Sequence, residues 1–163
     1  YLTIENRGWI ERELRPLMGN WIMGCDICQA VCPWQRFAIQ TQETGFYPSD
    51  LDRAAPALLD LLALTDESFA ARYAATPLSR IKRERLVRNA CIASGNWGDP
   101  SASLPLGNLL GDDSPLVRGH AAWALGRIGG LAARAALAAR LPPEPDPLVR
   151  EEIEWALVAI GPL

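Results

Sequence analysis

The sequence predicts a mainly α-helical protein in two parts, an irregular cysteine-rich module followed by a solenoid of stacked helix pairs. Two observations lead to this fold class. Cys25, Cys28 and Cys32 cluster in a region with few long periodic segments, where bound cofactors rather than helices are expected to dictate the structure. The rest of the chain is rich in Ala and Leu and repeats a helical pattern about every 30 residues. We therefore expect domains at 1–48 and 49–163.

The three cysteines have the spacing C-x2-C-x3-C-P, which is the later part of a bacterial iron–sulfur ligand run. Iron requires deprotonated sulfur ligands, and a tight loop can wrap around a compact cluster. Ile22 stands where a preceding cysteine would be expected, so the motif does not complete a cluster alone. Either Cys91 supplies a fourth sulfur, or the remaining ligands lie in polypeptide outside this sequence.

Structural zinc is the alternative use of a C-x2-C pair. A second such pair or a nearby histidine would normally complete a zinc site, and the only histidine, His120, lies in a predicted repeat helix. The cluster spacing and its final proline therefore favour iron over zinc, and we expect residues 1–48 to be the C-terminal part of a ferredoxin-like iron–sulfur module. We expect His120 to have a packing role, and Cys91, at an apolar position of another repeat helix, to act as a small core residue.

Between the cysteines and the repeats, local signals predict short helices. Residues 11–14 suggest one short helix before the cysteine loop. A helix start is expected near 49–52, followed by a leucine stripe that ends at Leu64. Thr65 then provides an N-cap for a further helix, which Pro77 ends.

An internal repeat occupies the last part of the chain. The tripeptide Leu-Val-Arg occurs at 86–88, 116–118 and 148–150, which gives offsets of 30 and 32 residues. We predict repeat helices near 84–98, 115–129 and 147–161, with Trp97, Trp123 and Trp155 as scaffold residues of the stack. One helix pair cannot bury its apolar face alone, so the pairs should stack into a continuous core that resembles short HEAT repeats.

Charge and hydropathy narrow the class of protein further. The net charge is −3, and no apolar stretch reaches the length that spans a bilayer, so we expect a soluble cytoplasmic protein without membrane contact. Because the chain starts at Tyr1 in sequence that already reads as structured, we expect a fragment. One run is strongly basic, which fits either a solvated helix face or a nucleic-acid surface. Its cationic members are Arg80, Lys82, Arg83, Arg85 and Arg88.

Several of these motifs resemble the C-terminal half of the epoxyqueuosine reductase family. The resemblance is carried by residues 1–5, 13–20, 24–29 and 31–34, and by residues 76–80 with the basic run after them. It covers nearly the whole chain and is weakest in the last repeats, where any solenoid would look alike. The resemblance implies an oxidoreductase that depends on cobalamin and two [4Fe–4S] clusters and acts in the last step of queuosine formation at the tRNA wobble base.

The resemblance also implies roles for individual residues. Cys25 and Cys28 would ligate one cluster together with cysteines upstream of this sequence, and Cys32 would ligate the other cluster. Asp26 would approach the cobalamin. The catalytic acid and most of the cobalamin site would lie upstream, so no catalytic residue is assigned here and the fragment alone should be inactive.

For partners, the resemblance implies that the basic run contacts phosphates of the tRNA anticodon stem-loop, and that a low-potential electron donor supplies a monomeric enzyme. The main alternative is a ferredoxin-like electron-transfer module fused to a protein-binding HEAT-like scaffold. A third hypothesis is an interaction scaffold stabilised by zinc, without a redox role.

Overall fold

A computed structural model describes residues 1–48 and 50–161. As predicted, the fold is mainly helical, and the described ranges contain no β-strand. The α-helices are α1 (Ile27–Ala30), α2 (Leu51–Ala54), α3 (Leu58–Leu62), α4 (Asp66–Tyr73), α5 (Lys82–Trp97), α6 (Ser103–Leu109), α7 (Pro115–Ile128), α8 (Gly130–Arg140) and α9 (Pro147–Ile160). Short 3₁₀ helices occupy Pro16–Met18, Pro33–Phe37, Thr44–Phe46, Pro77–Ile81 and Pro100–Ala102.

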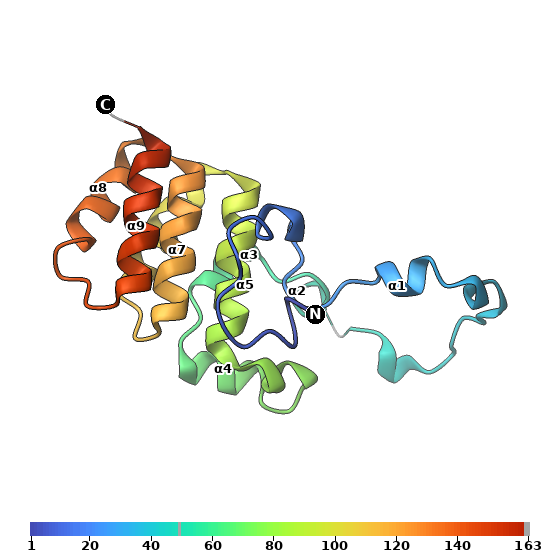
Figure 1. Ribbon diagram of the computed structural model, residues 1–163. Helices are drawn as coiled ribbons and strands as arrows, with labels where there is room; N and C mark the ends of the chain where they lie inside the picture. Colours follow the sequence, from blue (N-terminus) through green and yellow to red (C-terminus); the bar gives the residue numbers. More distant parts are fainter. Residues whose placement is uncertain (49, 162–163) are drawn as a thin grey trace.

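The helices from α5 onward form a two-layer solenoid (Figure 1). In one layer α7 packs between α5 and α9, and in the other layer α6 packs against α8. Local sequence determines where these helices start and stop: Pro115 and Pro147 occupy first turns, and Gly98 ends α5 in the left-handed region at φ 74°. The three predicted repeat helices are therefore confirmed to within two residues at each end.

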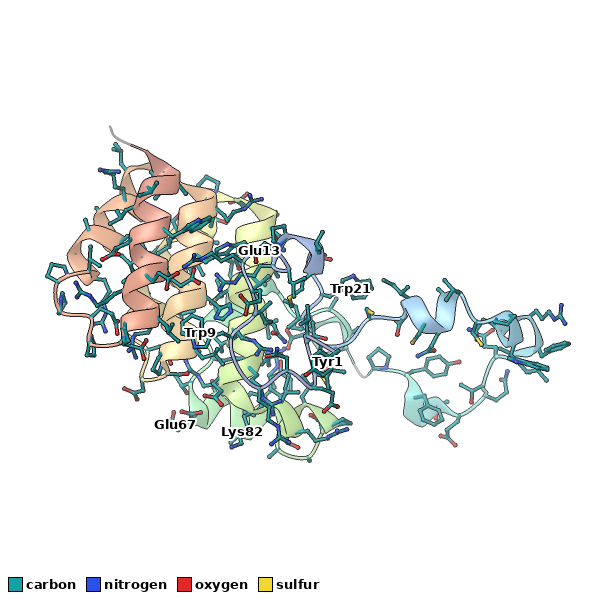
Figure 2. All side chains as sticks on the ribbon, in the orientation of Figure 1. Tyr1, Trp9, Glu13, Trp21, Glu67 and Lys82 are labelled. Atoms are coloured by element: carbon teal, nitrogen blue, oxygen red, sulfur yellow. The ribbon has the colours of Figure 1, made fainter. Side chains whose placement is uncertain are left out.

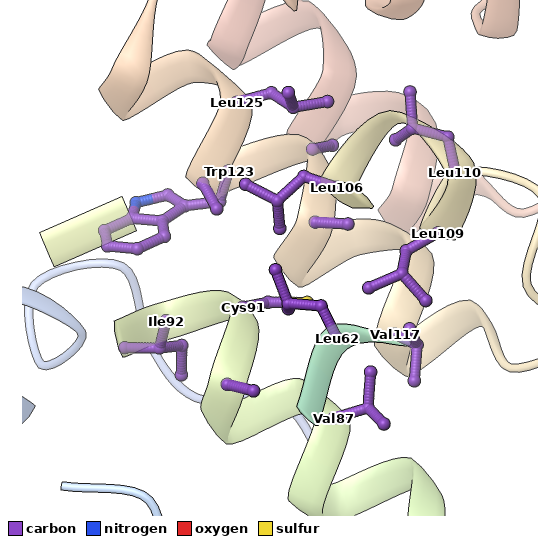
Figure 3. Close-up of a cluster of buried hydrophobic side chains, with 14 of the residues drawn as sticks. Leu62, Val87, Cys91, Ile92, Leu106, Leu109, Leu110, Val117, Trp123 and Leu125 are labelled. Atoms are coloured by element: carbon purple, nitrogen blue, oxygen red, sulfur yellow. The ribbon is translucent and has the colours of Figure 1, made fainter. Parts of the chain in front are cut away.

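The core of the solenoid lies between the two layers and includes Cys91 on α5 (Figure 3). The helices approach closely because two glycines face a neighbouring helix. A Cβ at Gly95 would lie 2.6 Å from the Trp123 ring, and a Cβ at Gly126 would lie 2.7 Å from Ala156 Cβ. Trp123 is buried, as expected for a scaffold residue, and Trp155 packs against the core. Trp97, the last residue of α5, is half exposed, so the prediction of a scaffold role for it is wrong.

The segment between the cysteines and the solenoid follows the predicted order of short helices. Thr65 caps α4, and its side chain forms a capping box with Ser68. Pro77 opens a 3₁₀ turn that leads into α5. The predicted helix start near 49–52 corresponds to α2, although Ser49 lies outside the described residues.

The N-terminal residues divide into two structurally different stretches. Residues 1–24 form turns, including those over 12–15 where a short helix was expected, and they lie against the solenoid layer made by α5, α7 and α9. Residues 25–48, which we call the arm, extend away from the helical body (Figure 1). The predicted domain boundary between 48 and 49 stays a prediction, since Ser49 lies outside the described residues. None of the helices in the described ranges has the length and apolarity needed to cross a membrane.

Candidate metal centre

The three clustered cysteines all lie at the start of the arm. Cys25 and Cys28 are exposed and Cys32 is partly exposed, and all three thiols are free. Cys28 is on the short helix α1, whereas Cys32 caps the 3₁₀ turn that begins at Pro33. Asp26, at the N-cap of α1, is also exposed and caps no backbone N–H with its side chain.

The chemistry of this donor set fits iron–sulfur ligation, but the set is incomplete. Three free thiols lie within eight residues, outside the packed core, where they can reach a cluster. Within the described parts of the chain, no group of three Cys, His, Asp or Glu side chains converges on one point.

Around these thiols the arm presents large apolar side chains to solvent (Figure 2). Trp34, for example, directly follows Pro33 and is 72% exposed. A soluble module normally buries such residues. Their number in one short segment therefore indicates an interaction surface. The exposed side chains are Ile27, Val31, Trp34, Phe37, Ile39, Phe46 and Tyr47.

Cys91 does not take part in the metal centre. It is completely buried in the solenoid core, and burial raises the pKa of its thiol. A thiol that is held protonated is a poor iron ligand, because iron binds the thiolate. The structure therefore confirms the packing role expected for Cys91.

Residues of the basic run differ in their surroundings. Arg80 is 72% exposed and makes only a 3.6 Å ion pair with Glu5, which is also exposed. Lys82 is exposed as well, and it has a φ of 59°, which is uncommon for a residue other than glycine. Both side chains lie at the N-terminal end of α5 and can contact an anion in solution.

The other three basic side chains are bonded inside the protein. Arg83 donates to Leu64 O at 2.7 Å and pairs with Asp112 at 2.5 Å. Arg85 is buried and donates to Ile4 O at 3.0 Å and to Arg80 O at 2.5 Å. Reaching a phosphate would require either arginine to break these bonds.

Arg88 is completely buried, with an exposed fraction of 0%. Its guanidinium donates to the backbone oxygens of Leu2 at 2.9 Å, Asn6 at 3.1 Å and Gly8 at 2.7 Å. Burial, together with the charge of Arg85, lowers its pKa to about 10. The expectation that all five basic residues form one phosphate-binding surface therefore needs correction, because the folded protein exposes only part of the run.

The docking of residues 1–24 on the solenoid depends on His120, for which a packing role was expected, and on residues that the sequence did not single out, among them Trp9 and Glu152. Trp9 stacks on His120 of α7 with ring centroids 5.2 Å apart, and His120 Nε2 accepts a hydrogen bond from the Ile10 N–H at 3.4 Å. On α9, Glu152 accepts two hydrogen bonds from Arg15, at 2.8 and 2.9 Å. These partners lie more than 100 positions apart in sequence, so no local pattern indicates the pairing.

Both parts of the chain match known protein families. A model of HEAT repeats matches residues 76–158, which is just over half of the chain. A model described as a 4Fe-4S double cluster binding domain matches residues 1–35, including the three clustered cysteines.

Curated relatives include epoxyqueuosine reductases from several bacteria. The Pseudomonas aeruginosa protein is 44% identical over 134 residues, which cover 79% of this chain and 36% of the relative. The Escherichia coli K12 protein is 42% identical over 127 residues, with 77% and 33% covered. The Burkholderia pseudomallei protein is 40% identical over 161 residues, with 98% and 34% covered. The chain thus spans about a third of the length of the curated relatives it matches.

Among solved structures, a crystal structure of epoxyqueuosine reductase with an epoxyqueuosine-modified tRNA stem loop is 32% identical, with a TM-score of 0.87. The match covers 96% of this chain and 42% of that one. The similarity thus includes the arm and the docked segment as well as the solenoid, and the resemblance seen in the sequence is confirmed. The chain belongs to the family of HEAT-repeat proteins, and along nearly its whole length it is similar to a part of the epoxyqueuosine reductases.

Proposed function

We propose that this chain is the C-terminal part of an epoxyqueuosine reductase, an oxidoreductase that converts epoxyqueuosine to queuosine at the wobble position of tRNA. The observation that carries the proposal is the match to the structure with the modified tRNA stem loop, because it covers 96% of this chain. The match to a double-cluster domain at residues 1–35 supports the redox class independently of the solenoid.

In this proposal the chain contributes cluster ligands but no catalytic residue. Cys25 and Cys28 ligate one [4Fe–4S] cluster with upstream cysteines, and Cys32 ligates a second. When bound, the clusters would supply single electrons received from a low-potential donor, and cobalamin, held mainly by the upstream part, would supply the reducing chemistry. The exposure of the arm supports this division, since its apolar side chains would be covered by the rest of the enzyme. Asp26 is proposed to lie near the cobalamin.

The tRNA surface of the chain is proposed to be smaller than the basic run. Arg80 and Lys82 can meet phosphates of the anticodon stem-loop, because both are exposed. We assign Arg83, Arg85 and Arg88 to internal hydrogen bonding, which maintains the fold beneath that surface. We further propose that the full-length enzyme is a monomer and acts in the cytoplasm.

The alternative, an electron carrier fused to a protein-binding scaffold, has less support from the geometry. HEAT-like solenoids commonly bind extended partners along one face. Here the layer formed by α5, α7 and α9 is contacted by residues 1–24 of the same chain. A partner would have to displace this segment or use another face.

The test uses the full-length protein, purified without oxygen, with epoxyqueuosine-containing tRNA as substrate. We expect iron in the purified protein, cobalamin binding, and conversion to queuosine. Cys28→Ser should lose cluster iron and activity, whereas Cys91→Ala should keep the iron because that thiol is buried away from the arm. Iron-free protein containing one zinc ion would contradict the proposal and favour the zinc scaffold.

A further inference from the structure

Two stretches of backbone are held together at the base of the arm by one side chain of α5. Asn89 is completely buried, and its Nδ2 donates to Thr3 O at 2.9 Å and to Ile22 O at 2.7 Å. Thr3 Oγ1 in turn accepts the N–H of Gly24 at 2.9 Å. Ile22 and Gly24, which lead directly into Cys25, are thus held by hydrogen bonds to Asn89 and Thr3, respectively.

The orientation of the Asn89 amide is determined by its neighbour. Arg88 donates from Nε and Nη2 to Asn89 Oδ1, at 3.1 and 3.0 Å. Because the guanidinium has only donors, the Asn89 oxygen must face it, and both Nδ2 hydrogens are left for the two carbonyls. Among the described residues, no carboxylate forms an ion pair with Arg88.

Comparison of the repeats shows that this use of Arg88 is particular to the first copy. Arg118 and Arg150 occupy the equivalent position of the Leu-Val-Arg tripeptide. Arg118 donates to Asp112 O at 2.9 Å and Arg150 to Leu141 O at 2.9 Å, in the turns before their own helices. Arg88 reaches backbone about 80 positions earlier instead, so its hydrogen bonds serve the docked segment rather than the solenoid.

A buried cation without a carboxylate costs stability unless hydrogen bonds compensate for the lost water. The buried Arg88 guanidinium is therefore an unfavourable way to stabilise the solenoid itself. It does provide a fixed orientation for Asn89, and through it fixed positions for Thr3 and Ile22. The cysteine loop leaves the body two residues after Ile22, at Gly24, which has a φ of 68°.

We propose that Asn89, oriented by Arg88, is a positioning residue for the iron–sulfur cluster that Cys25 ligates. It holds the backbone of Thr3 and Ile22 next to the departure point and thereby sets where the first thiolate of the motif lies. The inference rests on the proposed function, because it requires that Cys25 binds a cluster. Groups that orient metal ligands from outside the coordination sphere commonly change metal retention and electronic properties when they are altered.

The experiment compares two substitutions in the full-length, anaerobically purified protein. Asn89→Asp keeps the size and the acceptor for Arg88 but removes both donations to Thr3 and Ile22. Asn96→Asp is the matched control: Asn96 is also on α5, and its Nδ2 donates to two carbonyls, those of Arg15 and Gly19, both at 2.8 Å. Asn96 lies seven residues after Asn89 on α5, and neither of its two carbonyl partners belongs to Thr3 or to residues 22–24.

We expect Asn89→Asp to shift the electron paramagnetic resonance spectrum and midpoint potential of the reduced clusters, and to speed iron loss to a chelator roughly tenfold. Asn96→Asp should leave all three at the unsubstituted values. Thr3→Val, which removes only the acceptor for Gly24 N–H, should change the same three quantities in the same direction to a smaller extent, and it keeps the test valid if Asn89→Asp fails to fold. Unchanged spectra and iron loss in a folded Asn89 or Thr3 variant, or equal changes in the Asn96 control, would overturn the proposal.

A separate measurement distinguishes this inference from the proposed function. Amide hydrogen exchange of the iron-free protein at Gly24 and Cys25 should speed up in Asn89→Asp and not in Asn96→Asp. Unchanged exchange overturns the positioning role even if the protein binds iron. Faster exchange in a protein that never acquires iron would show that Asn89 restrains the backbone. It would also refute the proposed function, and with it the role of Asn89 in positioning a cluster.

Discussion

At the residue scale, side chains of one type take different roles according to neighbours that are remote in sequence. The five basic residues between Arg80 and Arg88 look alike as a run of charges. The structure exposes Arg80 and buries Arg88, because the carbonyls that bind Arg88 belong to residues 2–8. The spacing of the cysteines could be read from the sequence, since it is local. The environments of Arg85 and Arg88 could not, since they depend on docking across about 80 positions.

Gly119 gives a sharp test of that docking. A Cβ at this position of α7 would lie 2.2 Å from Trp9 Cη2, so Gly119→Ala should displace the tryptophan and lower the free energy of unfolding by about 1–3 kcal/mol. Gly107→Ala on α6 is the control, because its Cβ would meet Ala136 Cβ at an ordinary 3.7 Å. Urea unfolding monitored by tryptophan fluorescence measures both. Equal stability of the two variants would show that Trp9 is not packed as described.

His120 should make stability depend on pH in the neutral range. Burial, followed by the positive charge of Arg15, lowers its pKa well below the usual 6.5, so the folded state keeps the ring neutral. The unfolded chain takes up a proton below pH 6.5 and the folded chain does not, so this contribution is complete above pH 6.5 and is lost as the pH falls. His120→Gln should make the midpoint of urea unfolding less dependent on pH between pH 7 and pH 5. A slope identical to that of the unsubstituted protein would rule out this assignment.

At the scale of elements, the solenoid helices were predictable and the docked segment was not. Proline at first turns, glycine at helix ends and the apolar period of α5, α7 and α9 are local signals, and each lies within the helix it defines. Residues 1–24 have no such period. Their backbone carbonyls are satisfied by donors on α5, including Asn89 and Asn96, and a segment that depends on another element for its hydrogen bonds carries no pattern of its own.

The turn between α8 and α9 supplies a prediction at this scale. Burial would raise the pKa of Glu144, but hydrogen bonds from Arg118, the Asp146 N–H and Arg140 outweigh it and lower the pKa to about 2. Because the folded pKa is below the ordinary 4.5, the resulting stability is complete above pH 4.5 and is lost as the pH falls toward 2.

The size of this contribution is about 3 kcal/mol at neutral pH, at about 1.4 kcal/mol for each pKa unit. Glu144→Gln should therefore be clearly less stable than the unsubstituted protein at pH 7, and the difference should shrink on acidification. Urea unfolding at pH 7 and pH 3 measures it. A constant difference at both pH values would contradict the assigned ion pairs.

At the scale of the whole molecule, the two exposed cations of the basic run, Arg80 and Lys82, lie at the end of the solenoid where α5 begins, on a protein whose net charge is −3. If this end contacts tRNA, Arg80→Ala and Lys82→Gln in the full-length enzyme should each weaken binding and lower the slope of log affinity against log salt by roughly one. Arg127→Ala, an exposed residue near the opposite end of α7, is the control and should leave the slope unchanged. Equal slopes in all three variants would place the RNA elsewhere.

The docked segment also has a consequence for competition. Because residues 1–24 are covalently attached to the surface that they occupy, their local concentration there is at least on the order of millimolar. A free peptide that copied their sequence would have to exceed that concentration to enter, and a foreign ligand would need a correspondingly higher affinity. The covalent attachment of residues 1–24 therefore protects the layer of α5, α7 and α9 from weak, non-specific binding.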